Sequence, residues 1–187
     1  MGQEKQHGIT HQLLEVMCDY PPELLVVQTR SPLVTRDIEL LERLGDRVVV
    51  AMTIPTNRED VRQAFEFRSP RIANRISALA ELRASGIRTQ ASLAPLLPCD
   101  TDALAGIVAP HCDWVVAQAL KLPGHGARTW EPALATLKER GWEGWVQGGV
   151  DVQAALETLR AYFGARYHEG REGFNLEWKD GGAPAAS

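Results

Sequence analysis

The run VVVAM, residues 48–52, constrains the fold more than any other part of the sequence. It is continuously apolar rather than alternating, as expected of a β-strand whose two faces are both covered in a parallel sheet. Three further apolar segments occur, each followed by a helix-like stretch; the four segments are residues 24–28, 48–54, 87–97 and 114–120. This repetition predicts an α/β fold with a parallel sheet and about four βα units.

Capping and stop residues divide the intervening stretches into helices. Each predicted helix begins at a capping residue or at a residue followed by proline, and all but the one beginning at Asp100 end near a glycine. The predicted starts are Thr35, Ser69, Asp100, Thr129 and Asp151. The segment GWEGWVQGG, residues 141–149, fits either a short strand or a tryptophan-bearing loop.

Composition limits the classes of protein that the sequence fits. The 187 residues are 44% hydrophobic, enough for one globular domain with a substantial core. A net charge of -4 gives no global electrostatic support for binding nucleic acid. There is no apolar run of membrane-spanning length, and the start MGQEKQHGIT lacks the apolar core of a secretory signal, so a cytoplasmic protein is expected.

The cysteines do not follow a metal or disulfide pattern. Cys18, Cys99 and Cys112 are odd in number and widely separated, which predicts reduced, unpaired thiols. His111 and Cys112 are adjacent rather than spaced as two ligands on one helix face. The sequence also lacks a Walker loop, a dinucleotide fingerprint and a nucleophile elbow, so it predicts no metal ligand and no catalytic residue.

Polar residues follow the predicted strands, and the carboxyl ends of parallel strands meet at one rim where ligands commonly bind. Guanidinium and ammonium groups beside hydroxyls suit a carboxylate or phosphate ligand. The candidate ligand-binding residues are Thr29, Arg30, Thr53, Ser92 and Lys121. The alternative is that each of these side chains only caps a strand or binds water.

The ordered series TRSPLVTRDIELL, VAMTIPT, FEFRSPRIANRISALAELRASGIRTQASLAPLLP and ALKLP resembles the later part of the radical S-adenosylmethionine (radical SAM) barrel, in its spore photoproduct lyase-like branch. The resemblance covers about residues 10–123 and implies a partial (β/α) TIM-type barrel. Around it we expect a polar extension at 1–9, a C-terminal helical extension at 124–179 and a disordered tail at 180–187.

The resemblance assigns roles to individual positions. Arg30 stands where the family has a lysine, and Thr53 where it has a serine; in the family both positions help to bind the methionyl carboxylate of S-adenosylmethionine. Glu66 and Arg75 match a glutamate and a helix arginine, and Lys121 begins a match to an RLP motif. The implied parent reaction is reductive cleavage of S-adenosylmethionine to a 5′-deoxyadenosyl radical that abstracts hydrogen from a substrate.

The sequence also departs from the family pattern. Phe67 replaces the proline that follows the family's glutamate, and no CxxxCxxC motif occurs to hold a [4Fe-4S] cluster. The family's first two strands have no counterpart, so residues 24–28 are predicted to form an exposed sheet edge. We therefore expect no independent radical catalysis, with a missing N-terminal half or a second copy of the chain as partner at this edge.

Two other readings remain open. The first is a binding or interaction module that pairs through the exposed sheet edge. The second is an ordinary α/β enzyme that acts on a phosphorylated or carboxylated metabolite through Arg30 and Lys121.

Thymine photoproduct in DNA is the substrate of the family branch, but the net acidity of this chain argues against a large DNA-binding surface. The region with Trp130, Trp142, Trp145 and Trp178 is expected to be buried.

Overall fold

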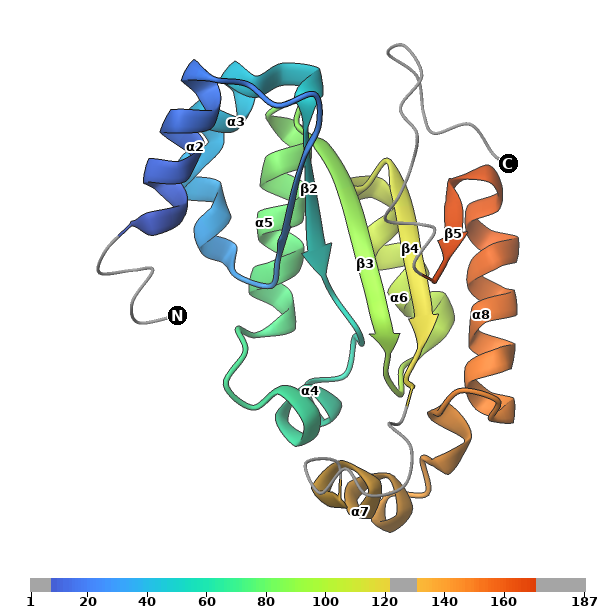
Figure 1. The fold of residues 1–187 in the computed structure, drawn as a ribbon. Helices are drawn as coiled ribbons and strands as arrows, with labels where there is room; N and C mark the ends of the chain where they lie inside the picture. The colour runs from blue at the N-terminus through green and yellow to red at the C-terminus, as the bar shows by residue number, and fades with distance from the viewer. Residues whose placement is uncertain (1–7, 122–130, 171–187) are drawn as a thin grey trace.

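The computed structural model describes residues 8–121 and 131–170, in which five parallel strands form one open sheet of order β1-β2-β3-β4-β5 (Figure 1). The strands are β1 (Leu25–Thr29), β2 (Val48–Thr53), β3 (Arg88–Leu96), β4 (Trp114–Ala119) and β5 (Tyr167–Glu169). The first four confirm the predicted apolar segments. The fifth strand was not predicted, and it brings the region after residue 123 into the same sheet.

The helices are α2 (Ile9–Asp19), α3 (Ile38–Leu44), α4 (Glu59–Glu66), α5 (Ile72–Ala84), α6 (Thr101–Val108), α7 (Glu131–Glu139) and α8 (Val150–Phe163). Short 3-10 turns are η1 (Pro32–Asp37), η2 (Gly45–Arg47), η3 (Ala109–His111), η5 (Glu143–Trp145) and η6 (Gly164–Arg166). Among the described residues, no helix has both the length and the apolar character needed to cross a membrane.

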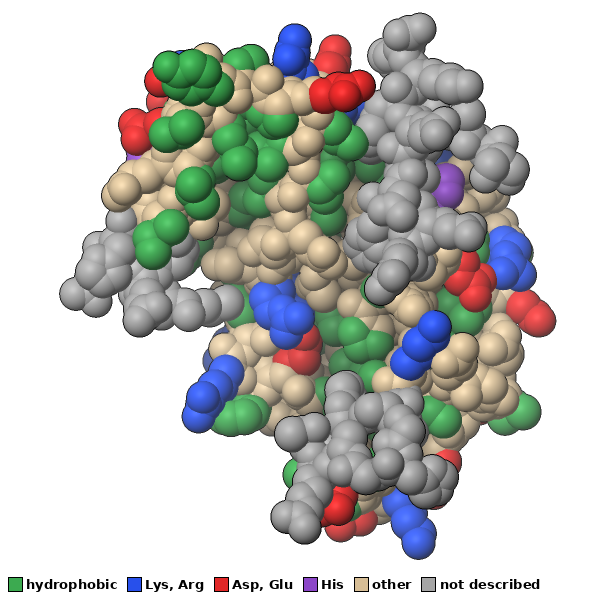
Figure 2. Space-filling model, viewed as in Figure 1, with side chains coloured by type: hydrophobic (Ala, Val, Ile, Leu, Met, Phe, Trp, Pro, Cys, Tyr) green, Lys and Arg blue, Asp and Glu red, His purple; other side chains and the backbone are tan. Residues whose placement is uncertain are grey.

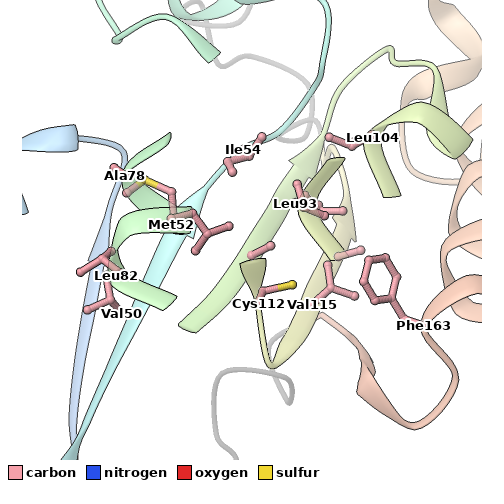
Figure 3. Packing of buried hydrophobic residues seen from close by; sticks show 14 of the residues in the cluster. Val50, Met52, Ile54, Ala78, Leu82, Leu93, Leu104, Cys112, Val115 and Phe163 are labelled. Carbon is pink, nitrogen blue, oxygen red and sulfur yellow. The ribbon is translucent and has the colours of Figure 1, made fainter. Parts of the chain in front are cut away.

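The helices α3, α5, α6 and α8 cover one face of the sheet, and the view in Figure 1 looks onto the other face. We call this other side the helix-free face; Figure 2 shows hydrophobic side chains on its upper part and over α2. The main core lies between the sheet and its covering helices. There, Val50 and Met52 of β2 meet Ala78 and Leu82 of α5 (Figure 3). One-sided coverage of a parallel sheet is the arrangement of a barrel wall, here open rather than closed.

Two of the predicted helix starts can be compared directly with observed caps. Asp100 caps α6, because its carboxylate accepts a hydrogen bond from the Ala103 backbone N–H at 3.1 Å. Thr35 is not a cap: η1 precedes α3, and the Ser31 hydroxyl accepts the capping bond from the Leu33 N–H at 3.3 Å. The Thr35 hydroxyl instead donates to the Pro32 carbonyl.

Other predicted boundaries also shift. The prediction at Ser69 is wrong by a few residues, since α5 begins at Ile72, and the preceding helix α4 was not predicted. The prediction at Asp151 is confirmed within one residue by α8. Thr129, residues 1–7 of the predicted extension and the predicted tail at 180–187 lie outside the described residues.

The segment 141–149 is a loop with one 3-10 turn, η5, and an isolated bridge between Leu120 and Val146. Trp142 is buried there in a small apolar cluster, and Trp145 is partly buried beside it, as expected. Trp130 and Trp178 lie outside the described residues.

Candidate ligand-binding rim

The strand register brings three of the five candidate residues together. Thr53 is paired with Ser92, so the two side chains point to the same face of neighbouring strands. Arg30 directly follows β1, one position beyond the pair formed by Thr29 and Met52, and so lies level with Thr53. Arg30, Thr53 and Ser92 thus form a row level with the carboxyl ends of β1 and β2. Ser92, predicted to lie at a strand end, lies in the middle of β3.

A pair of ionic contacts fixes the arginine of this row. Arg30 Nη1 lies 2.9 Å from Glu66 Oε1, and the other oxygen of Glu66 lies 2.9 Å from Arg75 Nη2. The Arg30 side chain is 51% exposed, whereas Glu66 is 10% and Arg75 is 0% exposed. The three groups together carry one net positive charge, and that charge faces solvent at Arg30.

Arg75 connects this ion pair to the backbone. Its Nη1 donates to the Thr53 carbonyl at 3.1 Å, and its Nε donates to the Pro70 carbonyl at 3.1 Å. A buried guanidinium is tolerated only when its donors are satisfied and its charge is paired. Arg75 therefore ties α5 to the end of β2 and holds Glu66 where it meets Arg30.

A second buried arginine, Arg62, holds the connection between α4 and α5. Its Nη1 donates to the carbonyls of Glu66, Phe67 and Ser69 at 3.2, 3.4 and 2.8 Å, and its Nε donates to Glu59 at 2.6 Å. Phe67, which stands where the family has a proline, is 68% exposed. The departure at Phe67 therefore leaves Glu66 fixed, because Arg62 binds the backbone carbonyls of Glu66 itself and of Phe67 and Ser69 after it.

The hydroxyls of the rim differ in how they are satisfied. Ser92 is fully buried, and its Oγ has no hydrogen-bond partner within the described part of the chain. Thr56, in contrast, donates to the Pro98 carbonyl at 2.7 Å and accepts from the Arg58 N–H at 3.0 Å, which makes it a structural residue. Buried polar atoms without a partner are rare, so Ser92 Oγ is a candidate for ligand or water contact.

The other two candidates are not brought into the row. Thr29 pairs with Met52, which packs in the helix-covered core, and its hydroxyl accepts a bond from the Ser31 N–H at 3.0 Å. Thr29 also lines a hollow of about 110 Å³ beside Asp37, on the other side of β1 from Arg30. Lys121 is exposed after β4, and the remainder of its motif, residues 122 and 123, lies outside the described residues.

Two further polar residues on the helix-free face were not singled out from the sequence. Gln90 is 2% exposed; its Oε1 accepts from Trp114 Nε1 at 3.0 Å, and its Nε2 has no partner in the described residues. His168 Nε2 is likewise buried without a partner there, and burial lowers the pKa of His168. The glutamine inside an apolar run was a usable signal, but His168 lies on the unpredicted β5.

The described residues contain no group of three or more side chains placed to hold a metal ion. Cys18, Cys99 and Cys112 are free thiols, and the Cys18 Sγ donates to the Leu40 carbonyl at 3.3 Å. Burial raises the pKa of both Cys99 and Cys112 to about 11. Because the thiolate is the metal-binding form, these two cysteines are poor ligands at neutral pH.

The open parallel sheet with helices on one face and polar residues beside the strand ends defines an α/β fold. Two solved structures of spore photoproduct lyase, a radical SAM enzyme, share this fold. A point mutant of that enzyme matches with a TM-score of 0.56 and 12% identity. A double mutant with bound AdoMet and dinucleoside spore photoproduct matches with 0.58 and 13%. Each match covers 90% of this chain and 56% of the other.

Relatives found by sequence are longer proteins of uncharacterized function. One from Acidianus two-tailed virus is 33% identical over 73 residues, which cover 39% of this chain and 24% of the relative. One from Methanocaldococcus jannaschii is 29% identical over 121 residues, or 64% of this chain and 46% of the relative. No model of a known protein family matches. The chain thus spans less than half of these curated relatives and little more than half of the solved structures.

Proposed function

We propose that this chain binds the methionyl carboxylate of S-adenosylmethionine through Arg30 and Thr53, as the carboxyl-terminal barrel portion of a radical SAM-like protein. The observation that carries the proposal is the half-exposed Arg30 guanidinium, held by Glu66 in one row with Thr53 and Ser92. The AdoMet bound in one structural neighbour supports this choice of ligand. In the parent chemistry, reductive cleavage of this cofactor supplies a radical.

The residues present fit a carboxylate ligand. A guanidinium has five N–H donors, and Glu66 contacts only one Arg30 nitrogen, so donors remain for an incoming carboxylate. Arg75 offsets the charge of Glu66, which would otherwise repel that carboxylate. The unpartnered Ser92 hydroxyl next to Thr53 offers another donor.

The residues present do not fit a [4Fe-4S] cluster. The sequence has no CxxxCxxC motif, and the described residues contain no cluster of metal-ligating side chains. We therefore propose that the chain performs no radical chemistry alone and that a partner polypeptide or segment supplies the cluster.

Calorimetric titration with S-adenosylmethionine tests this proposal. We expect Arg30→Ala to weaken binding by about 10- to 100-fold, because a charge-assisted hydrogen bond contributes about 1.5–3 kcal/mol. Arg71→Ala is the matched control: Arg71 is exposed at the start of α5, and its substitution should leave the affinity unchanged. Equal binding by Arg30→Ala and the unaltered chain would contradict the proposal, and binding of inorganic phosphate instead would favour a metabolite enzyme.

A second candidate function, an interaction module, is favoured by an uncovered surface around α2 and β1. Large apolar side chains recur at helical spacing along α2 and its C-cap and are exposed; they are Ile9 (53%), Leu13 (53%), Val16 (57%) and the C-cap Tyr20 (81%). We call them the α2 stripe. Val26 of β1 is also 39% exposed, and Figure 2 shows hydrophobic side chains over this part of the molecule.

The strand order leaves this surface without a neighbouring strand. β1 is an edge strand among the described residues, and α2 leads directly into it. A helix that enters a parallel strand normally follows another strand that pairs beside it. An edge of unpaired backbone groups next to an exposed apolar stripe is a site for strand addition. A second copy of this chain, or another polypeptide, is proposed to cover it.

Size-exclusion chromatography with light scattering tests the second-copy form of this proposal. We expect the chain to elute as a dimer, and Leu13→Lys combined with Val16→Lys to convert it to a monomer, because lysines in the α2 stripe oppose apolar contact. Val150→Lys is the control, since Val150 is 78% exposed on the distant helix α8. A monomeric unaltered chain would rule out pairing between copies.

A further inference from the structure

His11 of α2 has one ring nitrogen bound to a carboxylate and the other nitrogen accessible. His11 Nδ1 lies 2.7 Å from Asp37 Oδ1, whereas His11 Nε2 lies 3.8 Å from Glu15 Oε1, which is too far for a hydrogen bond. An ionised carboxylate only accepts hydrogen bonds, so Nδ1 carries the hydrogen that Asp37 accepts. In the neutral imidazole, the lone pair therefore lies on Nε2, the nitrogen near Glu15.

Asp37 is placed to orient this ring. Its side chain is 1% exposed, and each of its two oxygens lies 3.2 Å from Arg36 Nε, which holds the carboxylate in position. A histidine that binds a metal ion through one nitrogen usually donates the N–H of the other to a carboxylate, a carbonyl or water. This contact fixes the ring and raises its basicity. The contact between His11 and Asp37 matches that arrangement.

Glu15 places a second metal-binding atom beside the accessible nitrogen. His11 and Glu15 are four residues apart on α2, so their side chains lie on one face of the helix. The two side chains are 46% and 57% exposed, and an ion can reach both from solvent. Zinc bonds to nitrogen and oxygen are about 2.0–2.2 Å long, so a single ion can bridge the two atoms at their observed separation.

We propose that His11 Nε2 and Glu15 Oε1 bind a divalent transition-metal ion of the Zn²⁺ class, with Asp37 as the positioning residue behind the histidine. Imidazole nitrogen and carboxylate oxygen are both ligands that Zn²⁺ accepts. Water completes the coordination of the ion. Metal binding also fastens α2 to η1, because His11 connects the ion to Asp37. The site shares no residue with the Arg30 rim, so this inference goes beyond the proposed function and does not depend on it.

Calorimetric titration of the full chain with Zn²⁺ at pH 7.5 tests the site. We expect His11→Ala to abolish the binding of one ion and Glu15→Gln to weaken it at least tenfold. Asp37→Asn is expected to weaken it by about 10- to 100-fold, the usual effect of losing a carboxylate behind a metal-binding histidine. Glu42→Gln is the matched control, because Glu42 is an exposed glutamate on the neighbouring helix α3, and it should leave the affinity unchanged.

Thermal unfolding gives a second readout. At a free Zn²⁺ concentration about a hundred times the dissociation constant, we expect the melting temperature of the unaltered chain to rise by about 5–10 °C. His11→Ala should show no such rise. Glu15 is exposed, so Glu15→Gln should fold normally, and circular dichroism without metal checks that weaker binding by this variant is not caused by unfolding.

The opposite results would show that His11 makes ion pairs only. The proposal is wrong if the unaltered chain binds no Zn²⁺, or if His11→Ala and Glu15→Gln bind it as tightly as the unaltered chain does. Neither result affects the role proposed for Arg30, which is measured with a different ligand.

Discussion

Replacing Arg75 by methionine is expected to lower the free energy of unfolding by about 3–5 kcal/mol, as found when one partner of a buried ion pair is removed. Arg75 is fully buried, and its loss would leave Glu66, 10% exposed, without its innermost partner. The change would also free the carbonyls of Thr53 and Pro70, which accept bonds from Arg75. Urea denaturation followed by circular dichroism measures the difference.

The matched control is Arg71→Met, four residues earlier and exposed, for which the expected change is within about 0.5 kcal/mol. Adding Glu66→Gln to Arg75→Met should recover part of the loss, because the uncompensated charge is then removed. If Arg75→Met unfolds at the same urea concentration as the unaltered chain, the ion pair has no structural role.

Anaerobic reconstitution with iron and sulfide is expected to give no [4Fe-4S] cluster and no cleavage of S-adenosylmethionine. A cluster of this type needs several thiolates in close array. Cys112 is buried in the main core, and burial keeps Cys99 and Cys112 protonated at neutral pH, with pKa values of about 11. Iron and sulfide analysis, with chromatography for 5′-deoxyadenosine after addition of dithionite, measures both results.

A variant with all three cysteines replaced by serine is the control, and its background iron should equal that of the unaltered chain. If the unaltered chain binds about four irons and the serine variant does not, the cysteines assemble a cluster. Cleavage of S-adenosylmethionine by such a sample would overturn the expectation that the chain is inactive alone.

Much of the sheet was predictable because buried strands consist of apolar residues, which can be recognised in the sequence. The strand β2 is buried along its whole length, so its residues are apolar without alternation. The strand β5 has only three residues, YHE, and none of them is fully buried. Its pairing with β4 depends on the whole intervening chain, including α8, so no local pattern reveals it. Thr35 failed as a cap because Ser31 provides the cap of η1 instead.

Some residues of the rim were predictable because the carboxyl ends of parallel strands lie at the same edge of a sheet. Arg30 and Thr53 follow this rule, whereas Ser92 lies in the middle of β3 and enters the row through the strand register. Thr29 was misplaced because successive residues of a strand point to opposite faces. The pairing of Glu66 with both Arg30 and Arg75 is a contact between distant segments. Spacing alone does not show it, and only the family resemblance marked Glu66 and Arg75.

The contact of Glu66 with both arginines has an evolutionary consequence. Because the buried Arg75 pairs with one oxygen of Glu66, exchange between lysine and arginine at the outer position leaves no buried charge unpaired. Arg30 can therefore vary to suit the ligand, whereas Arg75 is held by the demands of folding. An alignment of homologues should therefore show both lysine and arginine at the position of Arg30 and almost only arginine at the position of Arg75.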